Sequence, residues 1–173
     1  MSAKPIKSIL FVCLGNICRS PLAEGLFRAV WGNERGTRHD IVLDSAATSG
    51  WEVGSAPDPR SIAVAARHGV DISGQRARRI APEDFSRFDL ILGMDRSNVR
   101  DLKALAPPSA RDRIHLYLEF ATGTGLDVPD PYYDGPEEFV SVYRMIREAS
   151  EALAKRLEAR VSAPTSGQAS STI

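Results

Sequence analysis

The stretch Ser8–Pro21 reads S-I-L-F-V-C-L-G-N-I-C-R-S-P and decides the fold around it. The continuous apolar run at 9–12 is typical of a buried parallel strand. Ser20 is a favourable N-cap residue, and Pro21 suits the first position of a helix because no N–H is needed there. Residues 13–19 therefore connect the end of a strand to the start of a helix.

This connection has the composition of an anion-binding loop. Unpaired N–H groups at a helix N-terminus point into such a loop, and the helix dipole favours negative charge. Gly15 and Asn16 tolerate the left-handed backbone conformation that a tight turn around an anion needs. The residues expected to bind a phosphate group are Leu14, Gly15, Asn16, Ile17, Cys18 and Arg19.

Three side chains indicate which reaction this loop could perform. We expect Cys13 to be a thiolate at neutral pH, because it lies in the field of the helix N-terminus. Arg19 offers a planar fork that binds two phosphate oxygens and stays charged, and Ser20 can donate its hydroxyl to the sulfur. Together they indicate covalent phosphoryl transfer through a phosphocysteine. The pair Cys13 and Arg19 alone would more often be a core cysteine and a surface arginine; the flanking residues reverse this and favour the catalytic interpretation.

The composition is typical of one globular domain. Of 173 residues, 43% are hydrophobic and 25% are charged, and 22 basic residues balance 22 acidic ones. A net charge of zero does not favour binding to nucleic acid or an acidic membrane. No stretch has the length and apolarity of a membrane span and no signal peptide is visible, while two cysteines suit a reducing cytoplasm.

Alternating apolar runs and amphipathic segments predict an α/β fold: a single three-layer domain with a four-stranded parallel sheet and helices on both faces. Ligands of such sheets bind at the carboxyl ends of the strands, where Cys13 lies. We assign the domain to residues 1–161 and predict a disordered C-terminal tail over 162–173, which is small and polar. The expected strands are about 8–12, 41–45, 90–94 and 114–117, and the expected helices about 21–31, 59–68, after Asp95 and from Pro136, with a shorter one starting at Pro82.

From about Ile6 to about Leu157, the chain resembles the low-molecular-weight protein tyrosine phosphatases. The motif V-C-L-G-N-I-C-R-S-P at 12–21 resembles the signature of that family, and three further segments are similar to it. They are D-S-A-A-T-S-G-W at 44–51, D-L-I-L-G-M-D-R-S-N at 89–98 and V-P-D-P-Y-Y at 128–133. The resemblance implies hydrolysis of phosphotyrosine and small aryl phosphates, with tyrosine-phosphorylated proteins as substrates and no cofactor.

A second catalytic group must protonate the leaving group of a phosphate ester. Asp130 lies between two prolines, which restrict where its carboxyl can point. The residues alone also allow a simple Asp-Pro turn; the resemblance implies the acid, which then serves as base towards water. The resemblance also implies that Trp51, Tyr132 and Tyr133 line the substrate cleft, although ordinary packing would also explain Tyr133.

By the same resemblance, Asn16, Ser45 and His68 brace the loop through hydrogen bonds. His68 has a second explanation, as a histidine that favours the C-terminal end of a helix dipole. Asp58 and Asp95 are explained as helix caps. Cys18 is either a small packed thiol or a partner that traps oxidised Cys13 as a reducible disulfide.

Two other functions remain open. The first is an arsenate reductase of the same fold, which in similar enzymes passes a disulfide to distal cysteines; this chain has none beyond Cys18. The second is a silent phosphotyrosine-binding module, which hydrolysis of p-nitrophenyl phosphate would exclude. His39, His68 and His115 are not spaced like the ligands of a metal site, so we expect no bound metal. We further expect a monomer in the cytoplasm, with a tyrosine kinase as candidate partner.

Overall fold

The computed structural model describes residues 5–33 and 40–167. Its sheet has four strands, all parallel, in the order β2-β1-β3-β4. They are β1 (Ser8–Cys13), β2 (Val42–Ala47), β3 (Leu90–Gly93) and β4 (Ile114–Leu116). The predicted α/β class and the four-stranded parallel sheet are confirmed.

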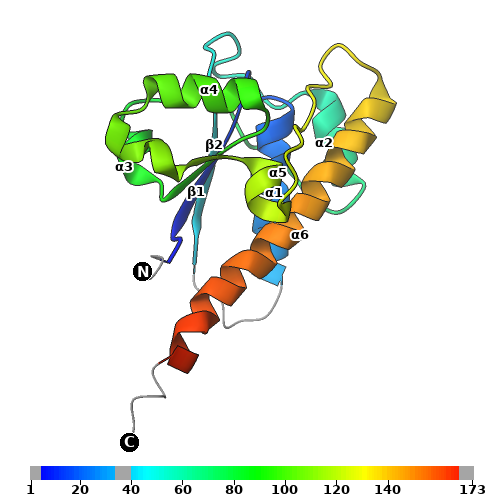
Figure 1. The fold of residues 1–173 in the computed structure, drawn as a ribbon. Coiled ribbons are helices and arrows are strands. Elements are labelled where there is room, and N and C mark those ends of the chain that lie inside the picture. The colour runs from blue at the N-terminus through cyan, green and yellow to red at the C-terminus, as the bar shows by residue number, and fades with distance from the viewer. Residues whose placement is uncertain (1–4, 34–39, 168–173) are drawn as a thin grey trace, which may run out of the picture.

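Helices cover both faces of this sheet (Figure 1). One layer contains α1, α2, α5 and α6, and the other contains α3, α4 and a 3-10 helix. Their bounds are α1 (Arg19–Asn33), α2 (Pro59–Ala66), α3 (Asp84–Arg87), α4 (Arg96–Leu105), the 3-10 helix Pro108–Arg113, α5 (Tyr117–Thr122) and α6 (Pro136–Gly167).

Strand β1 forms the middle of both hydrophobic cores. Its side chains alternate between the faces of the sheet, as the pleat requires. Ile9 and Phe11 pack in the core under α1 and α6, whereas Leu10 and Val12 pack in the core under α3 and α4. All four are fully buried, which explains why β1 is apolar at every position rather than at every second one.

The strand order reverses direction next to β1. The chain passes from β1 to β2 on one side and later returns to β3 on the other, which opens a crevice at the carboxyl ends of β1 and β3. Cys13 ends β1, and Asp95 follows β3. At Gly93 a Cβ would come within 2.9 Å of Val99 Cγ2, so only glycine lets α4 start this close to the strand.

Several boundaries differ from the predictions. The first helix begins at Arg19 rather than Pro21, because the Ser20 hydroxyl bonds to Cys13 Sγ and Asn16 Nδ2 instead of capping the helix. The same helix continues past Gly32 to Asn33. Tyr117, which was predicted to end the fourth strand, instead starts α5, a short helix that the sequence analysis did not predict.

The last helix begins at Pro136 as predicted, and its backbone continues to Gly167. The helix therefore includes 162–167, where the predicted disordered tail was to begin; 168–173 lie outside the described residues, where the tail stays a prediction. Within the described ranges, no helix combines the length and the apolarity that a membrane span requires.

Candidate active site

The thiol of Cys13 lies at the bottom of the loop and faces three hydrogen-bond donors. Its Sγ is 3.1 Å from Ser20 Oγ, 3.3 Å from the backbone N of Asn16 and 3.5 Å from the backbone N of Ser20. Cys13 is 2% exposed. Donors directed at a buried sulfur stabilise its anionic form, which is the form that attacks.

The guanidinium of Arg19 is equally buried, at 2% exposure. Its Nη1 donates to Asp95 Oδ2 at 2.7 Å and to the Val128 carbonyl at 2.9 Å. Burial acts to lower the pKa of Arg19, but Cys13, the hydrogen bond to Asp95 and the charge of Asp130 together raise it above its usual value. Among the described residues, the buried Nε of Arg19 has no partner. A buried N–H of this kind can donate a hydrogen bond to an oxygen of a bound anion.

Asp130 lies beside the buried guanidinium of Arg19 and lines the same cavity. Its Oδ2 is 3.5 Å from Arg19 Nη2, and its Oδ1 accepts a hydrogen bond from the backbone N of Tyr132 at 3.1 Å. The side chain is 38% exposed, so it can exchange protons with water. The carboxylate thus lies beside the guanidinium that would hold a phosphoryl group, where a leaving group can be protonated.

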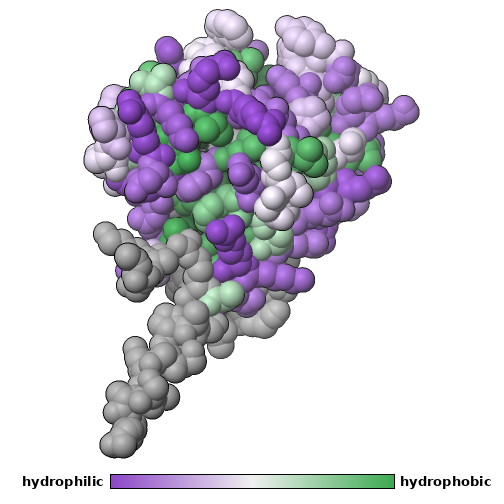
Figure 2. Space-filling model, in the orientation of Figure 1, coloured by the Kyte–Doolittle hydropathy of each residue, from purple (hydrophilic) through white to green (hydrophobic). Residues whose placement is uncertain are grey.

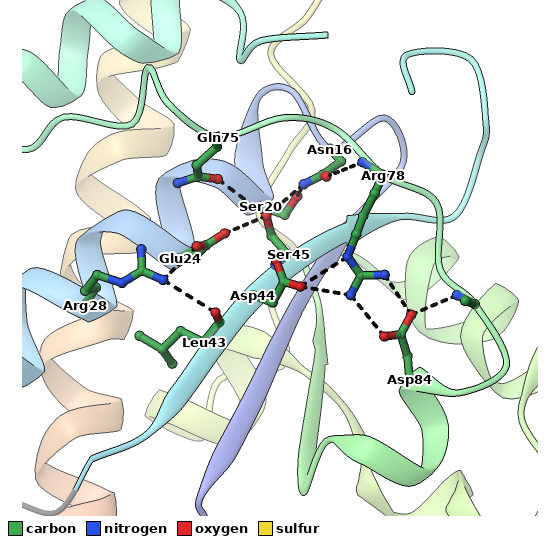
Figure 3. A network of polar contacts seen from close by, with 11 residues as sticks. Asn16, Ser20, Glu24, Arg28, Leu43, Asp44, Ser45, Gln75, Arg78 and Asp84 are labelled. Carbon is green, nitrogen blue, oxygen red and sulfur yellow. Dashed lines mark hydrogen bonds and ion pairs between the residues drawn. The ribbon is translucent and has the colours of Figure 1, made fainter. Parts of the chain in front are cut away.

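Asn16 is the centre of a buried polar network behind the loop (Figure 3). Its Nδ2 donates to Ser20 Oγ at 2.7 Å and to Ser45 Oγ at 2.9 Å, and its Oδ1 accepts from the backbone N of Arg78 at 3.0 Å. Within the described chain, Asn16 is the one non-glycine residue with positive φ, at 60°. The expected left-handed position is therefore Asn16, whereas Gly15 does not adopt it.

One arm of the network runs into α1. Ser45 donates to Glu24 Oε1 at 2.8 Å, and Glu24 also pairs with Arg28 at 2.8 Å. Gln75 lies 3.4 Å from the Ser45 hydroxyl and donates to the Pro21 carbonyl at 3.1 Å. The hydroxyl of Ser45, which is 4% exposed, thus donates one hydrogen bond, to Glu24, and accepts another, from Asn16.

The other arm is an ion-pair cluster around Arg78. Its guanidinium lies between Asp44, at 3.1 Å, and Asp84, at 3.0 Å. Burial acts to lower the pKa of Arg78, but these two carboxylates outweigh it and raise that pKa. Because the backbone N of Arg78 holds Asn16, this cluster positions the loop indirectly.

The outer side of the loop is held by α2 and its cap. The backbone N of Asp58 donates to the Ile17 carbonyl at 2.8 Å, and Ser61 Oγ donates to the Cys18 carbonyl at 3.1 Å. The Asp58 side chain caps α2 as predicted, and its hydrogen bonds from Arg60 lower its pKa. Arg60 also donates to the Tyr132 carbonyl at 2.9 Å, which links α2 to the segment that carries Asp130.

A cavity of about 170 Å³ opens above Cys13 and Arg19. Its rim includes the predicted aromatic residues, which are 81% exposed for Trp51, 38% for Tyr132 and 94% for Tyr133. The two tyrosine rings meet edge to face, 4.9 Å apart. Exposed aromatic rings at the rim of a polar pocket suit contact with a flat substrate ring, and packing in the core does not explain Tyr133.

The structure does not bring His68 to the loop. This residue is exposed beyond the end of α2, and its ring stacks on Tyr143 of α6 at 4.2 Å. The supporting role implied by the resemblance is therefore wrong for His68, and its place near a helix C-terminus agrees with the alternative. Gln75, which sequence analysis did not select, reaches the network instead.

Cys18 is a buried free thiol in the same loop. Burial, together with the negative charge of Asp58, raises its pKa. A thiol with a raised pKa is a poor nucleophile, so of the two cysteines Cys13 is the better candidate. Within the described residues, no group of three or more histidine, cysteine, aspartate or glutamate side chains is placed to hold a metal ion.

Comparison with known proteins agrees with this geometry. The model of the family "Low molecular weight phosphotyrosine protein phosphatase" matches residues 8–163. The chain is 40% identical over 159 residues to the phosphatase of that name from Sus scrofa, covering 91% of this chain and 99% of the relative. It is 42% identical over 149 residues to the "Low molecular weight protein-tyrosine-phosphatase" of Streptomyces coelicolor, covering 84% and 90%.

Solved structures share the fold. A protein tyrosine phosphatase from Entamoeba histolytica, with Hepes in its active site, superposes with a TM-score of 0.81 at 36% identity, covering 87% of this chain and 96% of that one. Vibrio vulnificus Wzb in complex with benzylphosphonate gives a TM-score of 0.78 at 31% identity, covering 87% and 99%. The chain belongs to the low molecular weight phosphotyrosine protein phosphatase family.

Proposed function

We propose that this phosphatase hydrolyses phosphotyrosine in proteins, and small aryl phosphates, through a phosphocysteine on Cys13. The observation that carries the proposal is the pairing of two buried groups. A sulfur that faces three donors lies in the same pocket as an arginine whose Nε lacks a partner among the described residues. Such a pocket binds a tetrahedral oxyanion next to a nucleophile.

In the first step the Cys13 thiolate attacks phosphorus, and the bond from phosphorus to the phenolic oxygen breaks. The electron pair leaves with that oxygen, and Asp130 in its protonated form transfers a proton to it. Arg19 and the loop N–H groups hold the phosphoryl oxygens, whose charge is spread in the transition state. The products are a phenol and a thiophosphate on Cys13.

In the second step water attacks the phosphorus of the phosphocysteine. Asp130 is now the carboxylate that accepts a proton from this water, and the electron pair of the S–P bond returns to Cys13. The hydroxyl of Ser20, 3.1 Å from Sγ, can donate to the departing thiolate. Inorganic phosphate leaves, and the protonated Asp130 is ready for another turnover.

Several wider features belong to the same proposal. We place the protein in the cytoplasm as a monomer, with a tyrosine kinase as candidate partner; the two free cysteines support the reducing compartment. We assign the phosphatase domain to residues 1–161, and the family match over 8–163 supports a boundary near this point, although α6 itself continues to Gly167. The arsenate reductase alternative lacks support, because the sequence has no cysteine after Cys18 to relay a disulfide.

The variant Cys13→Ser tests the nucleophile. We expect hydrolysis of p-nitrophenyl phosphate and of a phosphotyrosine peptide to fall by about 10⁴-fold or more, because a serine hydroxyl stays protonated here. Binding of the peptide, measured by isothermal titration calorimetry, should persist. Acid-quenched wild-type protein should carry one phosphate on Cys13, identified by mass spectrometry.

Cys18→Ser is the matched control, since it makes the same atomic change five residues away. It should keep kcat within a few-fold of wild type. Substantial turnover by Cys13→Ser, or equal losses in both variants, would refute the assignment.

A further inference from the structure

We propose that a second pocket, between α4, β4, α5 and α6, binds the linear polyphosphate group of a small ligand. It is a cavity of about 500 Å³, a size typical of sites for small molecules. None of its lining residues belongs to the loop or to the aromatic rim of the active site. Figure 2 shows hydrophilic side chains around hydrophobic ones on this face, over α4, α5 and α6.

The basic residues of the pocket follow one face of α4. Arg96, Arg100 and Lys103 are separated by four and then three positions, so they share that face. A rise of about 1.5 Å per residue places the first and last Cα atoms roughly 10 Å apart along the helix. A row of cations of this length matches a linear chain of several phosphate groups better than a single phosphate.

A fourth cation completes the pocket from the opposite side. The Arg156 guanidinium of α6 lies over the Phe120 ring, 4.2 Å from its centroid, and donates to the Phe120 carbonyl. Between the walls, His115 on β4 is half-buried, and its ring is 5.0 Å from that of Phe120. Burial lowers the pKa of His115, and so do the charges of Lys103 and Arg156, against a hydrogen bond with the backbone of Asp112 that raises it.

The balance of charge in the pocket favours an anionic ligand. Four permanent cations line it, against the single carboxylate of Glu119, although the whole chain carries equal numbers of basic and acidic residues. Arg96 is paired with Asp127 at 3.4 Å, and Arg100 with Asp101 at 3.8 Å. These side chains are largely exposed, and exposed pairs of this kind contribute little. A bound polyanion would offset the remaining repulsion.

The walls of the pocket also offer contact to an organic group. Val99, Ile114 and Leu116 supply apolar surface, and Phe120 and His115 supply aromatic rings. The shared chemistry is a polyphosphate chain, and it could come from a nucleoside triphosphate or from inorganic polyphosphate. Only the nucleotide would use the apolar walls.

Titration of ATP and, separately, inorganic triphosphate into the full ¹⁵N-labelled chain tests the proposal by NMR. We expect saturable shifts of the amides of Lys103, His115 and Phe120. The double variant Arg100→Glu/Lys103→Glu should weaken this binding by about tenfold or more, since charge-assisted hydrogen bonds become repulsions. Tighter binding of ATP than triphosphate would identify the nucleotide as the fitting ligand, and equal binding would identify the inorganic chain.

The matched control is Arg67→Glu/Arg144→Glu, which changes the net charge equally at exposed positions outside the pocket. It should bind within about twofold of wild type, because exposed charges further away than a Debye length are screened by salt. Both double variants should hydrolyse p-nitrophenyl phosphate like wild type, which confirms their fold. Shifts confined to Leu14–Arg19, or equal affinity in the two double variants, would overturn the proposal.

Discussion

The interior of the phosphate loop and the rim of its cleft are built in opposite ways. Behind the loop, Asn16 and Ser20 are 3% and 0% exposed; they are hydrogen-bonded to each other, and Asn16 is also bonded to Ser45 and to the backbone of Arg78. At the rim, Trp51 and Tyr133 are 81% and 94% exposed. The loop that we propose to be catalytic is firmly supported, whereas the aromatic surface that we propose to contact the substrate makes little packing contact.

This difference has a physical reason. A ring of N–H groups pointing inward is stable only if outer partners hold the backbone, and buried partners are costly to lose. Exposed rings cost little to change, since they contribute little to the core. We therefore expect substitutions in the interior to reduce stability and turnover together, and substitutions of the exposed aromatic residues at the rim to change substrate binding alone.

Of the substitutions in these two regions, that of Asp130 should have the largest effect, because Asp130 lies at the rim yet contacts Arg19 in the interior. Asp130→Ala should slow hydrolysis of esters with poor leaving groups by about 10²- to 10⁴-fold. Esters with good leaving groups should suffer less, since they need no proton. Values of kcat for phenyl phosphate and p-nitrophenyl phosphate measure the difference; Asp134→Ala is the control. Equal losses for both esters would show that Asp130 is not the acid.

Asn16 tests the interior itself. Asn16→Ala should lower the free energy of unfolding by about 2–3 kcal/mol, because it leaves Ser45 and the N–H of Arg78 short of a partner and places alanine, which tolerates positive φ less well than asparagine, at this position. Activity should fall with it. Asn16→Gly loses the same bonds without the strain, so urea unfolding of both variants separates the two causes. Unchanged kcat in both would contradict the supporting role.

Trp51 tests the rim. Trp51→Ala should raise KM for aryl phosphates by about two- to tenfold, the loss of one aromatic contact, with little change in thermal stability. Trp31→Ala is the contrasting control, because Trp31 is 7% exposed and stacks on Phe27. It should lower the free energy of unfolding by roughly 3–5 kcal/mol. A stability loss in Trp51→Ala as large as in Trp31→Ala would contradict the claim that the rim contributes little to stability.

Asp58 connects interior and rim, and should give the smallest effect. Its pKa is lowered in the folded protein by hydrogen bonds from Arg60, below the usual value of 3.8. Its charge therefore stabilises the fold above that value, and the contribution is lost as the pH falls through the lowered pKa. Asn also caps helices well, so Asp58→Asn removes mainly the charge. Unfolding from pH 7 to pH 2 should show the variant less stable at pH 7 and equal to wild type in acid; a constant gap would contradict this.

Much of this site could be predicted from the local chain. Cys13, Arg19 and Ser20 lie within one strand-loop-helix unit, whose geometry follows from apolar runs, caps and proline. The four parallel strands follow from alternation of the same kind. The predicted contacts of Asn16 with Ser45 and of Asp130 with the loop rested on the resemblance to a family, since no local pattern joins residues so far apart. The same resemblance implied a supporting role for His68 that the structure does not show, so a role carried over from a family can be wrong for an individual residue.

The chain by itself therefore allowed us to predict a candidate nucleophile, a candidate phosphate-binding loop and most of the order of strands and helices, because these depend on neighbours along the sequence. Only the tertiary structure decided which distant side chains support the loop: Glu24, Gln75 and Arg78 stand out as ordinary polar residues until the fold buries them around Ser45 and Asn16. It likewise gathered the cations of α4 and α6 into one pocket. Burial creates the need for partners, and burial is a property of the packed molecule.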